Sequence, residues 1–375
     1  MRHVPLPRRT FLRLVAAASG GALASSLFAA CRRALSLGEA MPTPLRPSPT
    51  NRPAEPPPPG PTARPTPSPT AAPPAPGRVA LVKTPDRAEG VRRALELLDL
   101  NPVQGKSVFL KPNFNSADPF PGSTHNDTLA ALIENLRRMG AGQLTIGDRS
   151  GMGDTRAVMR SKGIFAMAEE LGLETLVFDE LGPEEWEMFQ PEGSHWRRGF
   201  AVPRRVLAFE SIVQTCCLKT HRYGGHFTLS LKNSVGLAAK RIPGEGYNYM
   251  NELHGSRHQR RMIAEINLAY QPDLILLDGM EAFVDGGPAR GSKVAPGVIL
   301  AGTDRVAIDA VGVAILRYFG TTREVASGPI FGQEQIARAV ELGLGVQGPE
   351  GIELVTGDEA SAAFAAPIRD LLMPG

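Results

Sequence analysis

An α/β fold with a mostly parallel, doubly wound sheet and helices on both faces is predicted for the larger part of this 375-residue chain. From residue 78 onward, short apolar and β-branched runs alternate with longer segments of helical periodicity, which is typical of such a sheet. From Pro42 to Pro76 the chain is too rich in proline for any such pattern. We therefore expect one α/β domain over 78–375, preceded by a disordered linker over 32–77.

The expected strands are short and mostly apolar. They cover 79–82, 107–110, 144–146, 175–178, 212–218, 274–277 and 298–301. The expected helices carry apolar residues three and four apart, as at Val91, Leu95 and Leu98. They cover 86–98, 127–139, 155–171 with an interruption near Gly163, 228–239, 257–270, 304–318 and 333–342. The irregular segment 180–203 is expected to cover a sheet edge, and 247–254 to be a loop.

The first 31 residues carry the features of an export signal. Paired arginines stand in the run PRRTFLR at 7–13, and the apolar stretch that follows, 14–30, is diluted by glycine and serine. This pattern resembles the twin-arginine signal, through which proteins leave the cytoplasm already folded. We therefore expect the twin-arginine translocase as a partner and a location outside the cytoplasm. The competing interpretation, an amphipathic first helix, is disfavoured by the proline-rich sequence that follows.

The signal ends in a cysteine that can be lipidated. The run LFAAC at 27–31 resembles a lipoprotein cleavage box, in which small residues precede the modified cysteine. We expect Cys31 to be joined to lipid and to hold the protein at a membrane, on its periplasmic or outer face. Phe28 differs from the leucine usual at its position, so plain cleavage after Ala30 is the alternative.

The charge of the chain is distributed unevenly. The formal net charge of +3 depends on arginines in the signal and the linker, and the remaining domain carries a net negative charge. The basic balance therefore gives no reason to expect nucleic-acid binding by the domain. The linker itself, rich in Pro, Thr, Ser and Ala, favours extended polyproline conformations and is expected to act as a spacer.

The chain has three cysteines, Cys31, Cys216 and Cys217, which is too few for a disulfide framework. Cys216 and Cys217 are neighbours in an expected strand, so they are predicted to face opposite sides of the sheet as small apolar residues. A vicinal disulfide and a single thiolate ligand are the alternatives. No run of about 20 apolar residues that could cross a bilayer is present in the sequence.

Polar residues follow five of the expected strands. They are Lys111, Asn113 and Asn115; Asp148, Arg149 and Ser150; Lys219, Thr220, His221 and Arg222; Asp278 and Glu281; and Thr303 and Asp304. In open α/β sheets ligands bind outside the carboxyl ends of the strands, so we expect these groups at one edge. Each alone has a structural interpretation; a lysine there is commonly a solvated surface charge, and Asp304 is expected to cap a helix.

The run from His221 to Asn233 is the strongest indication of a ligand site. It combines imidazoles, Lys232 and the hydroxyl of Thr228 around the Gly224–Gly225 turn. We expect this turn to open a helix, where unpaired backbone N–H groups and the helix dipole favour an anion.

These motifs together resemble the bacterial domain of unknown function 362 family. The resemblance covers about 79–320 and rests on LKPN at 110–113, GDRSG at 147–151, LKTH at 218–221, TLSLKN at 228–233, DGME at 278–281, GGP at 286–288 and the run from Thr303 to Asp309. Many members are described as iron–sulfur proteins because they carry ferredoxin-type cysteine clusters. This chain lacks those clusters, so no iron–sulfur centre is expected, since such a centre normally needs four thiolates.

We predict an enzyme that acts on an anionic small molecule, by lyase, hydrolase or oxidoreductase chemistry. The predicted catalytic residues are Lys219, His221, Asp278 and Glu281. The predicted substrate-binding residues are Lys111, Asn113, Ser150, Thr228, Lys232 and Asn233. A divalent metal is predicted as a cofactor, held by some of Asp148, His221, Asp278 and Glu281, because carboxylate and imidazole suit such ions.

Three alternatives stay open at this point. In the first, the protein captures an anionic solute without changing it. In the second, which concerns the metal, Asp278 only caps the turn at Gly279 and Glu281 pairs with Lys219 or Lys232. In the third, the protein is a purely structural module at the cell surface.

Overall fold

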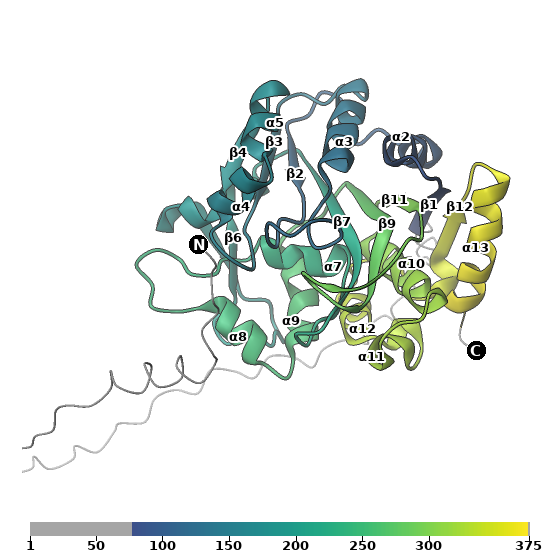
Figure 1. Cartoon of the computed structure of the whole chain (residues 1–375). Coiled ribbons are helices and arrows are strands. Elements are labelled where there is room, and N and C mark those ends of the chain that lie inside the picture. Colours follow the sequence, from purple (N-terminus) through teal and green to yellow (C-terminus); the bar gives the residue numbers. More distant parts are fainter. Residues whose placement is uncertain (1–76, 374–375) are drawn as a thin grey trace, which may run out of the picture. The chain divides into compact units, whose positions relative to one another are not determined.

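A ten-stranded mixed sheet forms the centre of the domain, and the computed structural model describes the chain over residues 77–373 (Figure 1). The strand order is β12-β1-β11-β9-β7-β2-β3-β4, with β10 paired to β9 and β8 paired to β7. The predicted export signal, the lipidation residue Cys31 and almost all of the linker lie outside the described residues and stay predictions.

The strands of this sheet differ in length, and β7 and β9 in the middle are the longest. The strands are β1 (Gly77–Lys83), β2 (Val108–Lys111), β3 (Leu144–Asp148), β4 (Glu174–Val177), β7 (Ser211–His221), β8 (His226–Thr228), β9 (Leu274–Gly286), β10 (Gly291–Val294), β11 (Val298–Gly302) and β12 (Ile352–Val355). A separate two-stranded sheet consists of β5 (Trp186–Phe189) and β6 (Phe200–Pro203). It occupies the segment that was expected to be irregular.

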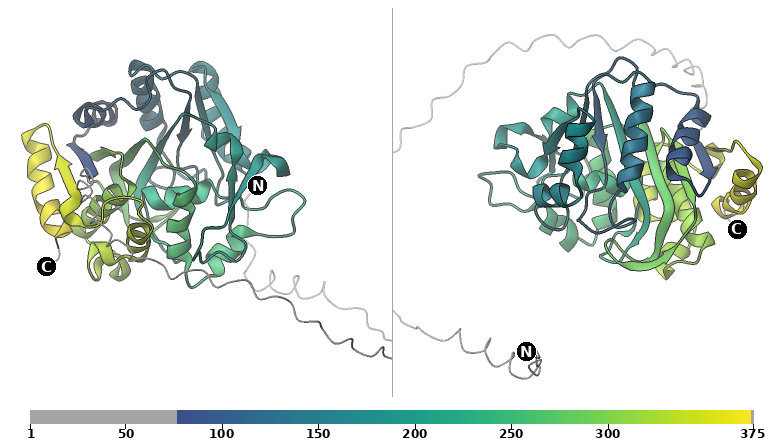
Figure 2. Two further views of the ribbon diagram at one scale, coloured as in Figure 1. Left: turned by 180° about the vertical axis from the view of Figure 1, so that it is seen from behind. Right: turned by 45° about the horizontal axis from the view of Figure 1, so that its top comes forward.

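Helices cover both faces of the large sheet. The first face is covered by α2 (Arg87–Leu98), α3 (Asn126–Arg138), α4 (Thr155–Ser161) and α5 (Ile164–Glu170), whose apolar residues share one core cluster (Figure 2). The second face carries α7 (Ser230–Asn233), α8 (Tyr249–Gly255), α9 (Gln259–Ile266), α10 (Arg305–Tyr318), α12 (Glu334–Glu341) and α13 (Glu359–Leu372). The short helices α6 (Arg204–Leu207) and α11 (Arg323–Ala326) lie in connections. The predicted α/β fold is confirmed.

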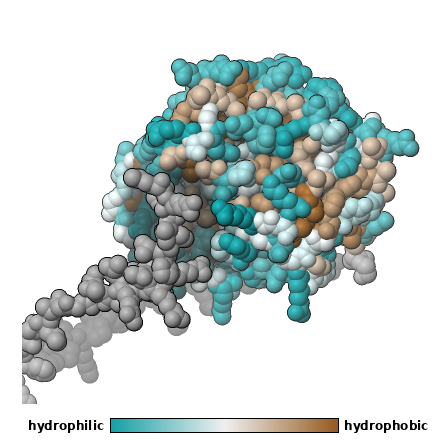
Figure 3. All heavy atoms as spheres, in the orientation of Figure 1, coloured by the Kyte–Doolittle hydropathy of each residue, from teal (hydrophilic) through white to brown (hydrophobic). Residues whose placement is uncertain are grey.

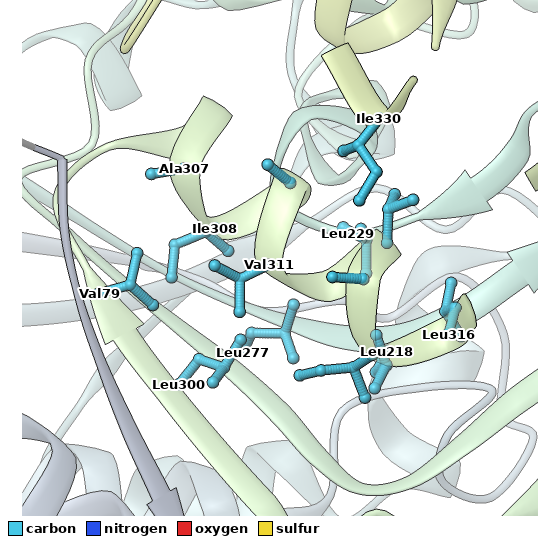
Figure 4. Packing of buried hydrophobic residues seen from close by; sticks show 14 of the residues in the cluster. Val79, Leu218, Leu229, Leu277, Leu300, Ala307, Ile308, Val311, Leu316 and Ile330 are labelled. Atoms are coloured by element: carbon cyan, nitrogen blue, oxygen red, sulfur yellow. The ribbon is translucent and has the colours of Figure 1, made fainter. Parts of the chain in front are cut away.

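The core on the second face is built around α10, which is buried almost along its whole length. Figure 4 shows Ile308 and Val311 of this helix packed near Leu277 of β9 and Leu300 of β11. Alternate residues of β9 serve the two faces, since Leu274 and Leu276 belong to the first face's cluster and Leu277 to the second. On the surface seen in Figure 3, hydrophilic and hydrophobic residues are intermixed, as is usual once the large apolar side chains are buried.

The direction of β11 differs from the expectation. Strands β4, β3, β2, β7 and β9 are parallel, but β11 runs antiparallel to both β9 and β1. The residues after β11 therefore lie at the opposite edge of the sheet from those after β2, β3 and β7. Thr303 and Asp304 are not part of the expected cluster, and Asp304 instead caps α10 by accepting the backbone N–H of Val306 and Ala307.

Several element boundaries also differ from the predictions. The segment predicted as a loop at 247–254 is mostly helix α8, which begins at an Asn248 cap. The helix predicted over 228–239 is short, because β8 and the four-residue α7 occupy its beginning. The interruption near Gly163 is confirmed, with Gly163 at a φ of 71° between α4 and α5. Among the described residues, no helix is long and apolar enough to span a membrane.

Candidate functional site

A polar cavity lies at the carboxyl ends of β2, β3 and β7, next to α7. It has an empty volume of about 380 Å³, part of which is open to solvent. Three lysines reach it from separate elements, namely Lys111 from β2, Lys219 from β7 and Lys232 from α7. Asp148 supplies the one carboxylate among the described residues that line it. The wall is therefore strongly cationic.

Lys111 and Asp148 form an ion pair beneath the cavity. The ammonium lies 2.8 Å from Asp148 Oδ1, and both side chains are almost fully buried. Lys111 Nζ also donates to the Pro112 carbonyl at 2.6 Å and to Asn233 Oδ1 at 3.3 Å. Burial lowers the pKa of Lys111 and raises the pKa of Asp148, so each depends on the other for its charge. A lysine has three N–H donors, and here all three have acceptors.

Lys219 is buried but has fewer partners. Its ammonium donates to the carbonyls of Gly122, at 2.6 Å, and of Pro288, at 3.3 Å. Two of its three donors are thus used, which leaves one for a ligand. Burial lowers the pKa of this lysine as well. Lys219 is positioned by backbone oxygens and has a donor to spare.

Lys232 differs from both of these lysines. It is 9% exposed, and its ammonium has no hydrogen-bond or ion-pair partner within residues 77–373. Burial, together with the nearby charges of Lys219 and Arg149, lowers the pKa of Lys232 to about 7. The ammonium therefore faces a cavity that is partly open to solvent, and its free donors and shifted pKa indicate a place for a ligand.

The helix that carries Lys232 is held by a buried carboxylate. Asp309 of α10 accepts the backbone N–H of Ser230 at 2.7 Å and of Leu231 at 3.2 Å. These are the first amides of α7, so they are not available to an anion. The expectation that a helix start after the Gly224–Gly225 turn binds an anion through its amides is wrong, because that turn joins β7 to β8 and Asp309 occupies the amides.

Three neutral polar groups near the cavity also lack hydrogen-bond partners in the described part of the chain. They are His221 Nδ1, Thr228 Oγ1 and Asn115 Nδ2, and all three are buried. Burial, followed by the charges of Lys232 and Lys219, lowers the pKa of His221 well below its ordinary value. The imidazole is therefore neutral near pH 7. A ligand that accepts from Thr228 and Asn115 would satisfy donors that are otherwise buried without partners.

Arg149 adds positive charge to the cavity wall, and most of its donors are used within the protein. Its guanidinium donates to the carbonyls of Ala238, at 2.7 Å, of Ser150, at 3.2 Å, and of Val235. The Lys111–Asp148 pair is electrically balanced, whereas the side chains of Arg149 and Lys219 have no carboxylate of residues 77–373 in hydrogen-bond contact. The cavity as a whole therefore favours an anion, whose contacts would fall to Lys232 and Lys219.

Residues 108–314 match the family described as Domain of unknown function (DUF362). The chain belongs to this family. A curated relative, a thylakoid-associated protein of Synechocystis sp., is 25% identical to this chain over 218 residues. That similarity covers 57% of this chain and 64% of the relative, which is less than two thirds of the relative's length.

Two solved structures resemble parts of this DUF362 protein. The lactate racemase apoprotein of Thermoanaerobacterium thermosaccharolyticum is 19% identical with a TM-score of 0.37, over 55% of this chain and 51% of that one. A protein from Thermotoga maritima is 15% identical with the same TM-score, over 58% of this chain and 55% of that one.

Most of the predicted site residues of the DUF362 protein do meet. The cavity is lined by Lys111, Asn113, Asp148, Lys219, His221, Thr228, Lys232 and Asn233. Ser150 is fully buried beside it and does not line it, since its hydroxyl donates to the Phe114 carbonyl at 2.6 Å. Ser150 therefore supports the loop after β2 and has no direct access to a ligand.

Asp278 and Glu281 lie elsewhere, which corrects the expectation that they join the site. Asp278 is within β9 and, by the alternation of that strand, faces α2 and α3. Its carboxylate accepts from Arg87 Nε at 3.0 Å and from the Thr128 hydroxyl. Glu281 is half exposed and pairs with Lys293 at 2.9 Å. Asp278 also caps the turn at Gly279, as the alternative interpretation expected, because its Oδ1 accepts the backbone N–H of Met280 at 3.0 Å. The alternative partners expected for Glu281, Lys219 and Lys232, are wrong, since Glu281 pairs with Lys293.

The predicted metal ligands are consequently not brought together. Asp148 and His221 line the same cavity, but Asp278 lies on the other face of the sheet and Glu281 lies at its surface. Within the described residues, no group of three or more His, Cys, Asp or Glu side chains is placed to hold a metal ion.

Cys216 and Cys217 are buried and not bonded to each other. Cys216 belongs to the second face's core, and Cys217 lies beside Asp278 in the register of β7 and β9. The predicted orientation to opposite faces is confirmed. Burial raises the pKa of Cys217 to about 11, so neither thiol is set up as a nucleophile.

Two glycines shape the cavity and were not predicted to do so. A Cβ on Gly236 would overlap Asp148 Oδ1 and lie 2.8 Å from Lys111 Nζ. A Cβ on Gly225 would lie 2.6 Å from Lys232 Cε and 2.9 Å from His221 Nδ1. Sequence offers little signal for such positions, because the need for glycine arises from side chains that are distant along the chain.

Proposed function

We propose that this DUF362 protein is an enzyme that binds a small anionic molecule in the cavity between β7 and α7. The observation that carries the proposal is Lys232, a buried amine that faces the cavity with no acceptor among residues 77–373. Lys219, Asn115 and Thr228 offer further unused donors around it. A carboxylate or phosphate group would supply acceptors to all of them.

Acid–base work in this site falls to Lys232 and His221. Lys232 has a pKa of about 7, so it can give or take a proton near neutral pH, which is the range in which a general acid or base is most effective. His221 is neutral and lies beside it, with Nδ1 unpartnered in the described structure. The proposed catalytic residues are therefore Lys219, His221 and Lys232, with Lys219 orienting the substrate. Proton transfer is common to lyase and hydrolase reactions.

Metal assistance would have to rely on Asp148, since the other predicted carboxylate ligands lie outside the cavity. Asp148 is the carboxylate in the cavity, and it is already bonded to Lys111 and to the backbone N–H of Phe114 and Arg149. A divalent ion there would have to displace Lys111 and tolerate the other cations. Elemental analysis of protein purified from its native export route tests this, and stoichiometric metal bound through Asp148 would revise the proposal.

A solute-binding protein without catalysis is the second candidate. The observation in its favour is that the expected catalytic carboxylates, Asp278 and Glu281, are bonded outside the cavity. A receptor for anions has no need of acidic groups in its pocket. The two candidates differ in whether a bound anion is recovered unchanged after incubation with the protein.

Export and lipid anchoring complete the proposed setting. The paired arginines at 8–9 and Cys31 indicate a protein that crosses the membrane folded and is then held by lipid. Replacing both arginines by lysine should leave the precursor in the cytoplasm, and Cys31→Ala should release the domain from the membrane fraction. Normal export of the first variant, or membrane retention of the second, would refute the respective step.

The binding proposal is tested by a thermal-shift screen against small carboxylates and phosphates. At least one should stabilise the wild type and should fail to stabilise Lys232→Met to the same degree. A wild type that no anion stabilises, or a Lys232→Met variant that responds equally, would show that the cluster is only structural.

A further inference from the structure

The three cavity lysines differ in how many of their N–H donors are used, and this difference bears on reactivity. Lys111 has acceptors for three donors and Lys219 for two, whereas Lys232 has none in the part of the chain that the structure describes. An amine acts as a nucleophile only through its lone pair, and hydrogen-bonded ammonium groups keep their protons. Desolvation and neighbouring cations are the usual means by which proteins free a lysine for covalent chemistry.

Both desolvation and neighbouring cations are present around Lys232. Lys219 and Arg149 are the neighbouring cations, and the side chain is 9% exposed. The end of the side chain packs closely against Gly225, where a Cβ would come within 2.6 Å of Lys232 Cε, so the glycine is what admits the amine to this position. The amine therefore stands at the wall of a cavity whose other unused donors suit a carboxylate.

We propose that Lys232 forms an imine with the carbonyl carbon of a small 2-oxo acid, whose carboxylate is held by Lys219, Thr228 and Asn115. This inference rests on the proposed function and names the substrate class. The cavity combines an amine that can act as a nucleophile with donors that can hold a carboxylate. A 2-oxo acid matches both, since its carbonyl carbon is adjacent to its carboxylate. Few other small anions offer an electrophile so close to the charge.

The step balances with the groups present. The lone pair of Lys232 Nζ attacks the carbonyl carbon, a C–N bond forms, and the carbonyl oxygen takes up a proton to give a carbinolamine. Loss of that oxygen as water, with the remaining nitrogen proton returned to the medium, gives the imine. No oxidant or reductant is consumed.

His221 is placed to move the protons of this step. Its Nδ1 is buried without a partner in the described residues, and it lies beside Lys232 across Gly225. As a neutral imidazole it can accept the proton that the amine loses on attack and return it to the departing hydroxyl. Lys111 cannot replace Lys232 in this role, because Asp148 and two other acceptors retain its protons.

The experiment is reductive trapping with the full chain. The protein is incubated with pyruvate, 2-oxobutyrate or 2-oxoglutarate in the presence of borohydride, which converts an imine into a stable secondary amine. Lactate serves as a matched acid without a carbonyl. We expect the mass of one reduced adduct with at least one oxo acid and none with lactate, and peptide mapping should place the adduct at Lys232.

Two variants control the site of attachment. Lys232→Arg keeps the positive charge but cannot form the imine, so it should lose the adduct. Lys240→Arg, at a partly exposed lysine outside the cavity, should retain it. Mapping in the wild type decides the question even if Lys232→Arg does not fold.

The outcomes separate this inference from the proposed function. Oxo acids that stabilise the protein thermally but leave no adduct at Lys232 would overturn the imine and leave the anion site standing. The same holds if other anions bind and oxo acids do not. If no anion of any kind alters the melting temperature, both proposals fail together. An adduct spread over many lysines, present equally in Lys232→Arg, also overturns the imine.

Discussion

Two buried charged groups on opposite faces of one sheet show how structural and functional polarity differ in this protein. Asp278 on the first face accepts from Arg87, from Thr128 and from the backbone N–H of Met280 at 3.0 Å. Lys232 on the second face has no acceptor among the described residues. A buried polar group whose hydrogen bonds are all made within the protein has a structural role. A group whose hydrogen bonds are incomplete indicates that a ligand supplies the missing partners.

The same contrast exists within the cavity, between Lys111 and Lys232, and it gives the largest expected effect. Lys111→Met removes the partner of a buried carboxylate and should lower the free energy of unfolding by about 3–5 kcal/mol. Lys232→Met removes an amine that has no partner within residues 77–373, and it should leave the stability unchanged or raise it. Chemical denaturation of the two variants measures this. Equal destabilisation by both changes would mean that Lys232 has a structural partner.

Replacing the cavity lysines should affect ligand affinity in the opposite order to their effect on stability. Once a stabilising anion is found, Lys232→Ala and Lys219→Ala should each weaken its binding by about 1.5–3 kcal/mol, the range for a charge-assisted hydrogen bond. Isothermal titration calorimetry gives the two values. If both variants bind like the wild type, the anion is held elsewhere and the comparison of the lysines loses its meaning.

A substitution at Gly236 tests whether the Lys111–Asp148 ion pair tolerates a side chain packed against it. Gly236→Ala would place a methyl group against Asp148 Oδ1 and Lys111 Nζ, and such overpacking should cost about 1–3 kcal/mol of stability. Gly246→Ala is the matched control, because nothing lies within 4 Å of its Cβ position. Thermal denaturation should show a loss for the first variant only, and a loss of the same size in both would point to a general backbone effect.

The smallest effect is expected at Asp278. Asp278→Asn keeps the shape but weakens the bonds to Arg87 and Thr128, so a loss of about 1–2 kcal/mol of stability is expected. Anion affinity and any activity should be unchanged in the folded variant, since the residue lies on the other face of the sheet. Loss of activity or metal content at full stability would restore Asp278 to the catalytic residues.

The sequence predicted the fold class and most cavity residues for a physical reason. Parallel strands carry their carboxyl ends to one edge, so Lys111, Asp148 and Lys219 had to meet once the alternation of strands and helices was recognised. The same reasoning failed for Thr303, because the antiparallel direction of β11 leaves no trace in local composition.

Asp278 was misplaced for a related reason. The predicted strand ended at residue 277, whereas β9 continues to Gly286, and a residue inside a strand is assigned to a face by its register. The distinction among the three lysines could not be predicted at all. It depends on Asp148 and Asn233 for Lys111 and on the carbonyls of Gly122 and Pro288 for Lys219, which only the folded chain brings to the ammonium groups.

The central claim, that Lys232 is a buried amine held ready for an anion, is tested most directly by NMR titration of its side chain in protein labelled at the lysine Cε carbons. Without ligand, the Lys232 resonance, assigned by its absence in Lys232→Met, should titrate near pH 7 because burial lowers its pKa. A bound anion favours the charged amine, so it should raise this pKa. Because the anion binds the protonated amine, the affinity of the protein for the anion should fall above pH 7 by up to about tenfold per pH unit. A Lys232 resonance that titrates like a surface lysine, and that no anion shifts, would contradict the account.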